Sequence, residues 1–387
     1  MRKEALAEEE VLQILEEMRA RDYSYDRFFS TMCTLPHPIA VRAHNMFLET
    51  NLGDPGLFPG VAEMEQRAVE MIGDLLHCPD AVGYISTGGT ESNIQAIRAA
   101  RNAVGIKDGN IIVPASAHFS FDKIADLLCL EVRKAELDES LKVDLSSVES
   151  LVDDRTVALV GIAGTTEFGQ VDPIEGLAKI ARPRGIHLHV DAAFGGFVLP
   201  FLEGDWRWDF AVDGVSSITI DPHKMGLATI PAGGLLFRGE KCMNALETDT
   251  HYLTKAKQTS LTGTRSGAAA AATYAVMMHL GREGFTEMVD YCMDLTRYLV
   301  AGARSLGIEP AIEPVMNVVA LKVPSPARVR EELMKRDWHV SMTREPGRAL
   351  RLILMRHMTK ENIDLFLEDL EDVLHSQSQV ETSVLTH

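Results

Sequence analysis

Two patterns of apolar and polar residues take turns along the first two thirds of the chain. Segments with the 3.6-residue period of a helix lie at residues 62–76, 90–103 and 173–185. Short, nearly continuous apolar runs stand between and after them, at residues 82–86, 110–115, 156–164, 186–193 and 215–221. Strands that alternate with helices in this way are typical of a mainly parallel sheet covered on both faces, so the pattern predicts an α/β fold.

The pattern changes near residue 266. Residues 266–281 have the small side chains of a buried helix, and a long helical pattern covers residues 282–307. Shorter strand and helix patterns follow at residues 317–323, 326–336, 339–343, 351–357 and 359–376. We expect three regions, which are an N-terminal helix with a wrapping segment (1–60), a large domain (61–280) and a small C-terminal α+β domain (281–387).

Composition and charge narrow the choice of partners. Hydrophobic residues make up 46% of the 387 residues and charged residues 24%, as in soluble globular proteins. The net charge of −18 disfavours binding to nucleic acids and to anionic lipids. The first 22 residues form an acidic amphipathic pattern without the apolar core of a signal peptide. We therefore expect a cytoplasmic protein with no nucleic-acid or membrane partner.

The distribution of cysteine and histidine gives no support for a metal site. The five cysteines are scattered and include no C-x-x-C pair, which argues against both a disulfide framework and a zinc site. His187 and His189 share one face of a predicted strand, but two histidines at this spacing are more typical of packing than of metal binding. No metal is expected.

The sequence STGGTESN, residues 86–93, has the properties of an anion-binding turn. It joins a predicted strand to a helix, and its two glycines allow the backbone to approach a ligand closely. Free N–H groups and the positive end of the helix dipole then meet at one point, which favours phosphate. An ordinary glycine-rich turn with a threonine cap is the alternative. The stretch lacks the lysine of a P-loop and the G-x-G-x-x-G spacing of a dinucleotide site.

Asp191 and Lys224 each follow a predicted strand, at the edge where ligands of α/β sheets bind. A carboxylate at that edge can pair with a protonated ring nitrogen, and Ala192 and Ala193 leave room for a flat ring. A lysine amine beside cationic or phosphate groups is the residue type that forms Schiff bases with aldehydes. A phosphate cradle, an acid and an amine together indicate pyridoxal 5′-phosphate.

Five motifs in this order resemble those of the group II pyridoxal-phosphate-dependent amino-acid decarboxylases: GGTES, HFSFDKIADLL, GTTEFGQVDPI, HVDAAFGG and SITIDPHK. The resemblance covers about residues 30–370. Residues 36–60 and 341–357 look most similar to the L-tyrosine/L-aspartate decarboxylases of methanogenic archaea. The resemblance to this family implies the type I, aspartate-aminotransferase-like fold, with a mainly parallel seven-stranded sheet in the large domain and a small C-terminal α+β domain.

The resemblance also assigns the residues that contact the cofactor. Lys224 would hold the aldehyde, and Asp191 would keep the pyridine nitrogen protonated. His118 would stack on one face of the ring and Ala193 on the other, with Thr165 near the ring hydroxyl. The phosphate would be bound by Gly89, Thr90, His223 and, from the neighbouring subunit, Ser266.

Three further residues are expected to act on the substrate. Tyr252 lies in a polar, turn-rich segment and would reprotonate the substrate carbon from a mobile loop, either in its own subunit or in the partner; an exposed loop tyrosine is the alternative. Arg351 would hold the substrate carboxylate through its planar fork, although a surface strand arginine would look the same. His37 is a candidate for the substrate entrance.

The expected protein is thus a homodimeric carboxy-lyase with active sites at the subunit interface. Its substrate would be L-tyrosine, giving tyramine for methanofuran biosynthesis, or L-aspartate, giving β-alanine for coenzyme A biosynthesis. A lyase similar to sphingosine-phosphate lyase, an aminotransferase and a non-catalytic protein that binds pyridoxal phosphate are the alternatives. His118 and the Tyr252 segment argue against the aminotransferase, because enzymes of that kind more often stack an aromatic residue on the ring.

Overall fold

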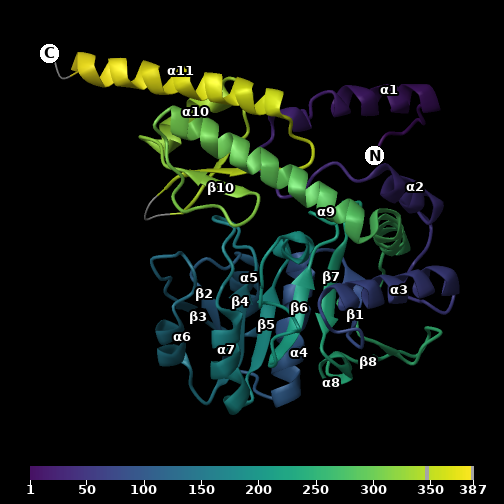
Figure 1. Ribbon diagram of the computed structural model, residues 1–387. Helices are drawn as coiled ribbons and strands as arrows, with labels where there is room; N and C mark the ends of the chain where they lie inside the picture. Colours follow the sequence, from purple (N-terminus) through teal and green to yellow (C-terminus); the bar gives the residue numbers. More distant parts are fainter. Residues whose placement is uncertain (345–347, 385–387) are drawn as a thin grey trace.

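A seven-stranded sheet forms the centre of the molecule (Figure 1). The computed structural model describes residues 1–344 and 348–384. The strands follow the order β1-β7-β6-β5-β4-β2-β3. Their bounds are β1 Val82–Ser86, β2 Asn110–Pro114, β3 Glu131–Ala135, β4 Thr156–Ile162, β5 His187–Asp191, β6 Val215–Ile220 and β7 Gly233–Phe237. Only β7 runs antiparallel to its neighbours, so the predicted mainly parallel seven-stranded sheet is confirmed.

Helices cover both faces of this sheet, as Figure 1 shows. They are α3 Pro59–Leu75, α4 Gly89–Val104, α5 Ser120–Leu128, α6 Leu145–Leu151, α7 Ile174–Ala181 and α8 Glu240–Asn244. Successive side chains of a strand pack in different hydrophobic clusters, because they point to opposite faces of the sheet. In β2, Ile111 and Val113 pack with residues of α4 and α5, whereas Ile112 joins the cluster that contains α7.

A single long helix, α9 (Gly267–Ser305), connects the two parts of the fold. Its alanine-rich start packs in the core of the large domain, and Leu295 and Leu299 belong to a separate hydrophobic cluster. The helix is broken at Gly281, whose φ of 57° is favourable only for glycine. Two helical segments therefore meet at Gly281, next to the domain boundary expected between residues 280 and 281, which stays a prediction.

The second cluster lies under a three-stranded antiparallel sheet of order β10-β12-β11. Its elements are β10 Val318–Leu321, α10 Pro326–Met334, β11 Ser341–Met342, β12 Leu350–Ile353 and α11 Lys360–Val384. In Figure 1 this small domain lies above the carboxyl edge of the large sheet. The arrangement brings β12 close to the ends of the parallel strands.

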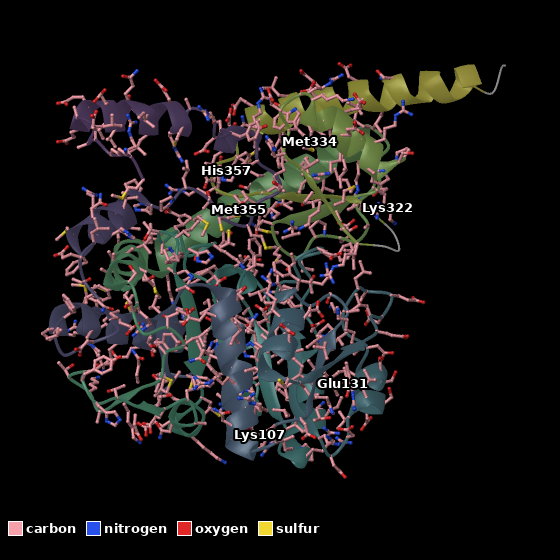
Figure 2. All side chains as sticks on the ribbon, turned by 180° about the vertical axis from the view of Figure 1, so that it is seen from behind. Lys107, Glu131, Lys322, Met334, Met355 and His357 are labelled. Carbon is pink, nitrogen blue, oxygen red and sulfur yellow. The ribbon has the colours of Figure 1, made fainter. Side chains whose placement is uncertain are left out.

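The N-terminal region divides its contacts between the two domains. It contains α1 (Glu8–Arg19), which buries no residue, a 3₁₀ turn at Tyr25–Arg27, and α2 (Pro38–Met46), which packs against α9. Phe29 is fully buried in the small-domain cluster, 4.8 Å from the ring of Phe366. His357, labelled in Figure 2, bonds to the Phe28 carbonyl at 3.1 Å and so ties this segment to the small domain.

The remaining elements are short. A hairpin of β8 (Thr248–Asp249) and β9 (Lys257–Gln258) precedes α9, and 3₁₀ turns occupy Arg182–Arg184, Gly195–Phe197 and Leu199–Phe201. Within residues 1–344 and 348–384, no helix is both long and apolar enough to span a membrane. The same residues contain no group of three or more His, Cys, Asp or Glu side chains placed to hold a metal ion.

Candidate active site

A cavity of about 310 Å³ lies where the parallel strands of the large sheet end. The sequence placed most of its candidate residues at this edge. Seven of them line the cavity together: Gly89, Thr90, His118, Asp191, Ala193, His223 and Lys224. Residues separated by up to 135 positions in the chain are thus brought into one site, because the carboxyl ends of neighbouring parallel strands lie side by side.

The turn between β1 and α4 forms one wall of the cavity and is tightly packed against the strand ends. A Cβ atom on Gly88 would lie 3.1 Å from His223 Cε1, and Gly88 also has a φ of 146°. A Cβ atom on Gly89 would lie 2.9 Å from Asp221 Oδ2. Glycine is therefore required at both positions. The 16-residue helix α4 starts here, so its positive end faces the cavity.

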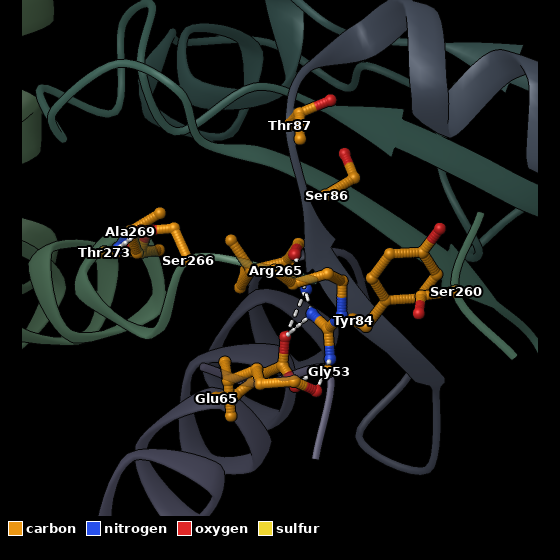
Figure 3. A network of polar contacts seen from close by, with 12 residues as sticks. Gly53, Glu65, Tyr84, Ser86, Thr87, Ser260, Arg265, Ser266, Ala269 and Thr273 are labelled. Atoms are coloured by element: carbon orange, nitrogen blue, oxygen red, sulfur yellow. Dashed lines mark hydrogen bonds and ion pairs between the residues drawn. The ribbon is translucent and has the colours of Figure 1, made fainter. Parts of the chain in front are cut away.

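A polar network connects this turn to neighbouring segments, and Figure 3 shows its Arg265–Glu65 pair beside Tyr84. Glu91 accepts hydrogen bonds from the backbone N–H of Thr87 at 2.9 Å and from its hydroxyl at 2.7 Å. The hydroxyl of Tyr84 donates to the other Glu91 oxygen at 3.0 Å, and burial raises the pKa of Tyr84 well above its usual value. Arg265 lies over the Tyr84 ring and forms a buried pair with Glu65 at 3.0 Å. The network fixes the turn to α3 and to the segment before α9.

Lys224 follows β6 and projects its amine into the cavity. Its Nζ lies 3.2 Å from Asp221 Oδ2. Burial alone would lower the pKa of Lys224, but the negative charges of Asp221 and Asp191 outweigh that effect and raise it. The second oxygen of Asp221 is buried without a hydrogen-bond partner. Asp221, which the sequence left without a role, is therefore the counter-charge of the lysine.

Asp191 ends β5 with its carboxylate fixed in orientation. Oδ2 accepts a hydrogen bond from Asn93 Nδ2 at 2.9 Å, and Oδ1 accepts one from the N–H of Ala193 at 3.1 Å. Asn93 was not singled out from the sequence, although it lies within the STGGTESN motif. The signal was its position one helical turn after Gly89, which places both residues on the face of α4 that borders the cavity.

The two histidines of the cavity are held by backbone N–H groups. Nδ1 of His118 accepts from the N–H of Ser120 at 3.2 Å, and Nδ1 of His223 accepts from the N–H of Ala232 at 3.1 Å. Burial lowers the pKa of both rings. Each neutral ring then carries its proton on Nε2, so His223 offers a donor beside the glycine turn.

Arg351 on β12 lies at the border of the cavity, in the small domain. Its guanidinium donates to the carbonyls of Thr166 and Ser30 and to the hydroxyl of Ser341, the last at 2.9 Å. Thr166 itself lines the cavity. Burial lowers the pKa of Arg351 to about 10. In the part of the chain that the structure describes, no carboxylate lies within ion-pair distance of this arginine.

Besides Arg351, four candidate residues do not line this cavity. The Tyr252 side chain is 88% exposed between β8 and β9. Thr165 is buried with its hydroxyl accepting from the Gln170 N–H, and its neighbour Thr166 lines the cavity instead. The Ser266 hydroxyl caps α9, and His37 caps α2 with its ring 5.0 Å from the ring of His279. The roles expected for these four residues stay predictions.

The residues of the cavity fit pyridoxal 5′-phosphate. The glycine turn, where any Cβ would collide, together with the start of α4 provides a phosphate site. Asp191 provides a buried carboxylate for a protonated ring nitrogen, and Lys224, which is partly exposed to the cavity, provides an amine for the aldehyde. Ala193 and His118 both border the space between these groups.

Comparisons with known proteins agree with this chemistry. Residues 48–323 match the model of the pyridoxal-dependent decarboxylase conserved domain. A probable L-tyrosine/L-aspartate decarboxylase of Methanothrix thermoacetophila is 70% identical over 371 residues, which cover 96% of this chain and 97% of the relative. A probable L-aspartate decarboxylase of Archaeoglobus fulgidus is 54% identical over 366 residues, 94% of this chain and 100% of the relative.

Among solved structures, the sphingosine-1-phosphate lyase of Burkholderia pseudomallei is similar with a TM-score of 0.87 at 27% identity. The match covers 100% of this chain and 96% of the lyase. The domain match and the two archaeal relatives both extend over the cavity and its lysine. The chain therefore belongs to the family of pyridoxal-phosphate-dependent decarboxylases, and pyridoxal 5′-phosphate is its cofactor.

Proposed function

We propose that this enzyme removes the α-carboxylate of L-tyrosine, L-aspartate or both, which yields tyramine or β-alanine. The names of the two archaeal relatives support these substrates, one naming both amino acids and the other aspartate alone. Tyramine is a precursor in methanofuran biosynthesis and β-alanine in coenzyme A biosynthesis, and we propose these two pathways for the products.

The observation that carries the proposal is the buried guanidinium of Arg351 beside the cavity. Among the described residues, this buried cation has carbonyl and hydroxyl oxygens as partners and retains a strong preference for an anion. A planar fork suits a carboxylate, which every amino-acid substrate carries. Because Thr166 borders both Arg351 and the cavity, a substrate carboxylate bound there would lie next to the cofactor site.

Residues of the large domain hold the cofactor in this proposal. When bound, the cofactor supplies an electron sink for the carbanion that remains after carbon dioxide leaves. Lys224 would hold its aldehyde. Asp191 would hold a proton at the ring nitrogen, and His223 would donate to the phosphate at the start of α4. His118 would pack against the ring without adding charge, because burial lowers its pKa.

Tyr252 supplies the final proton in the proposed reaction. Its phenol is exposed on the segment between β8 and β9, from which it can approach the substrate carbon after substrate has entered. Closure of this segment would also exclude water from the carbanion. We further propose a homodimer, in which Ser266 contacts the phosphate bound by the partner subunit.

A screen of all twenty L-amino acids tests the proposed reaction directly. Carbon dioxide and the corresponding amine are expected from L-tyrosine, from L-aspartate or from both. Lys224→Ala protein serves as the control and should release no carbon dioxide. Production of a keto acid without carbon dioxide would instead identify an aminotransferase and would contradict the proposal.

A sphingosine-1-phosphate lyase is the second candidate, because the structure with a TM-score of 0.87 carries that name. Such an enzyme cleaves a different C–C bond with the same cofactor. The screen separates the two functions when a phosphorylated long-chain amino alcohol is included. Cleavage of that compound to an aldehyde, with no carbon dioxide from any amino acid, would favour the lyase.

A further inference from the structure

A chain of buried hydrogen bonds leads away from Asp191 and begins at Asn93, which also lines the cavity. Asn93 Oδ1 lies 2.9 Å from His189 Nε2, and His189 Nδ1 lies 2.8 Å from the hydroxyl of Ser217. That hydroxyl lies 2.7 Å from His187 Nε2. We call Asn93, His189, Ser217 and His187 the His189 chain. Its members come from α4, β5 and β6 and are at most 8% exposed.

The regular pairing of β5 and β6 explains why these side chains meet. His187, His189 and Asp191 are two residues apart along β5, so all three point to the same face of the sheet. Ser217 is the residue of β6 that pairs with His189, and it lies between the two histidine rings. The face is covered by α4, which supplies Asn93.

The direction of each hydrogen bond can be assigned from Asp191 outwards. An ionised carboxylate only accepts, so the amide of Asn93 must turn its NH₂ toward Asp191 and its oxygen toward His189. His189 Nε2 is therefore the protonated nitrogen of that ring. The contact between Thr219 Oγ1 and the same Nε2, at 3.4 Å, adds a second acceptor for this proton.

The assignment continues through the second half of the chain. Burial lowers the pKa of His189 to about 4 and that of His187 to about 3, so both rings are neutral near pH 7. His189 Nδ1 is then bare and accepts from the Ser217 hydroxyl. The Ser217 oxygen in turn accepts from His187 Nε2, and the bare Nδ1 of His187 faces the Cys242 thiol at 3.9 Å.

Every donor in the His189 chain thus points toward Asp191. Within the described residues, all its buried side-chain nitrogens and oxygens have partners. Aligned hydrogen bonds polarise one another, and their positive ends converge on the carboxylate. Hydrogen bonds to the charged form of an acid favour that form. Reversing the direction would require every member to change its proton or its orientation at once.

We propose that Asn93, His189 and Ser217 are positioning residues for Asp191, whose carboxylate they hold in one orientation through a hydrogen-bond chain of fixed direction. The inference rests on the proposed pairing of Asp191 with the cofactor's ring nitrogen. His189, Ser217 and His187 do not line the cavity, whereas Asn93 does. These three residues act through Asn93 and the carboxylate, much as outer ligands orient the ligands of a metal.

Nitrogen NMR of the cofactor-free protein tests the direction of the chain without reference to activity. In protein labelled with ¹⁵N-histidine, His189 and His187 are both expected as the neutral Nε2–H tautomer at pH 7. A protonated His189, or the Nδ1–H tautomer, would overturn the proposal. This result does not depend on which amino acid the enzyme decarboxylates, so its failure is distinct from a failure of the proposed function.

Replacement of His189 tests the effect on the cofactor. His189→Leu removes both hydrogen bonds of the ring, whereas His189→Gln retains one donor and one acceptor. With ¹⁵N-labelled pyridoxal phosphate, we expect the leucine protein to lose ring-nitrogen protonation and to bind the cofactor about tenfold more weakly. The glutamine protein should lie between it and the wild type. An unchanged ring-nitrogen signal in the leucine protein would refute the positioning role.

A matched pair of milder variants covers the case in which His189→Leu fails to fold. Ser217 and Thr219 both lie on β6 and both place a hydroxyl next to His189, but only Ser217 belongs to the chain. Ser217→Ala is expected to weaken cofactor binding about threefold to tenfold and to shift the Nδ1 resonance of His189. Thr219→Val should stay within about twofold. Equal effects of the two changes would show general packing and would contradict the proposal.

Discussion

Asp191 and Tyr252 are both proposed to act during one reaction, yet they are held in opposite ways. Asp191 is 7% exposed and accepts hydrogen bonds on both oxygens. The Tyr252 side chain is 88% exposed. A group that binds a resident cofactor benefits from a fixed position, because no reorganisation is then needed during the reaction. A group that acts after substrate entry must first leave space for the substrate.

The segment around Tyr252 is attached to the N-terminal region through Thr254, two residues from the tyrosine. The N–H of Thr254 donates to Asp54 at 3.0 Å, and the N–H of Gly56 donates to the Thr254 hydroxyl at 3.1 Å. Gln95, on α4, donates to the carbonyl of Thr259 at 2.8 Å. These contacts connect the hairpin to the N-terminal region and to the large domain. The residues proposed to bind the cofactor are thus fixed, whereas Tyr252 lies on a tethered segment. This difference leads to four predictions.

Loss of Lys224 should have the largest effect, because it removes the amine that is proposed to hold the cofactor. In Lys224→Ala protein we expect no visible absorption band from bound cofactor and no detectable decarboxylation, while circular dichroism shows a folded chain. Lys335→Ala, at an exposed position on the small domain, is the control and should keep both signals. An unchanged cofactor spectrum in the Lys224 variant would disprove the assignment of the lysine.

Tyr252→Phe should separate catalysis from cofactor binding most clearly. Without its phenol, kcat is expected to fall about 10²–10⁴-fold, the usual range for loss of a general acid. Cofactor affinity and the cofactor spectrum should not change, because the residue lies outside the cavity. Tyr23→Phe, at another exposed tyrosine, serves as the control. Normal turnover by the Tyr252 variant would exclude it as the proton donor.

Arg351→Lys should affect substrate binding more than cofactor binding. Lysine keeps the charge but loses the planar fork, so KM is expected to rise about tenfold with a smaller change in kcat. Arg330→Lys is the matched control, because that arginine also donates to a backbone carbonyl in the small domain. Steady-state kinetics with the preferred amino acid measure both constants. Equal KM values for the two variants would leave Arg351 without a substrate role.

Asp54→Asn should have the smallest effect. It changes the contact between Asp54 and Thr254 that attaches the hairpin. An amide oxygen is a weaker acceptor for the Thr254 N–H than a carboxylate, so the hairpin should open more often. We expect severalfold faster hydrogen exchange at residues 248–258 and a change in kcat of less than about fivefold. Asp249→Asn, on the same hairpin, provides the comparison. If both variants exchange at the wild-type rate, the Asp54 contact does not hold the hairpin.

The sequence predicted most strands of the large sheet but missed two. Edge strand β3, EVRKA, carries charged residues and has no apolar run. Strand β7 begins with Gly233 and Gly234, which are poor strand formers. The structure explains why residue 233 is glycine, because a Cβ there would lie 2.5 Å from the Cα of Gly88 in the turn between β1 and α4. This requirement for glycine comes from a neighbouring segment, so the pattern of apolar and polar residues does not indicate it.

The candidate site shows the same limit. Residues that directly follow predicted strands, such as Asp191 and Lys224, could be placed at one edge from the chain alone. The partnership of Asn93 with Asp191 depends on how α4 packs on the sheet, and that of Asp221 with Lys224 depends on the conformation of the turn after β6. His189 was expected to have a packing role, and its hydrogen bonds to two other elements appear only in three dimensions.

Phe29 has a practical consequence for anyone who shortens the chain. Its ring fills the small-domain core between Trp338 and Phe366, although it precedes the large domain in sequence. A truncation that begins at residue 31 would open a void beside Trp338, in a distant part of the sequence, comparable to a Phe→Ala change that costs about 3–5 kcal/mol. Expression trials should therefore start upstream of Tyr23, whose ring lies 4.1 Å from the ring of His339 in the small domain.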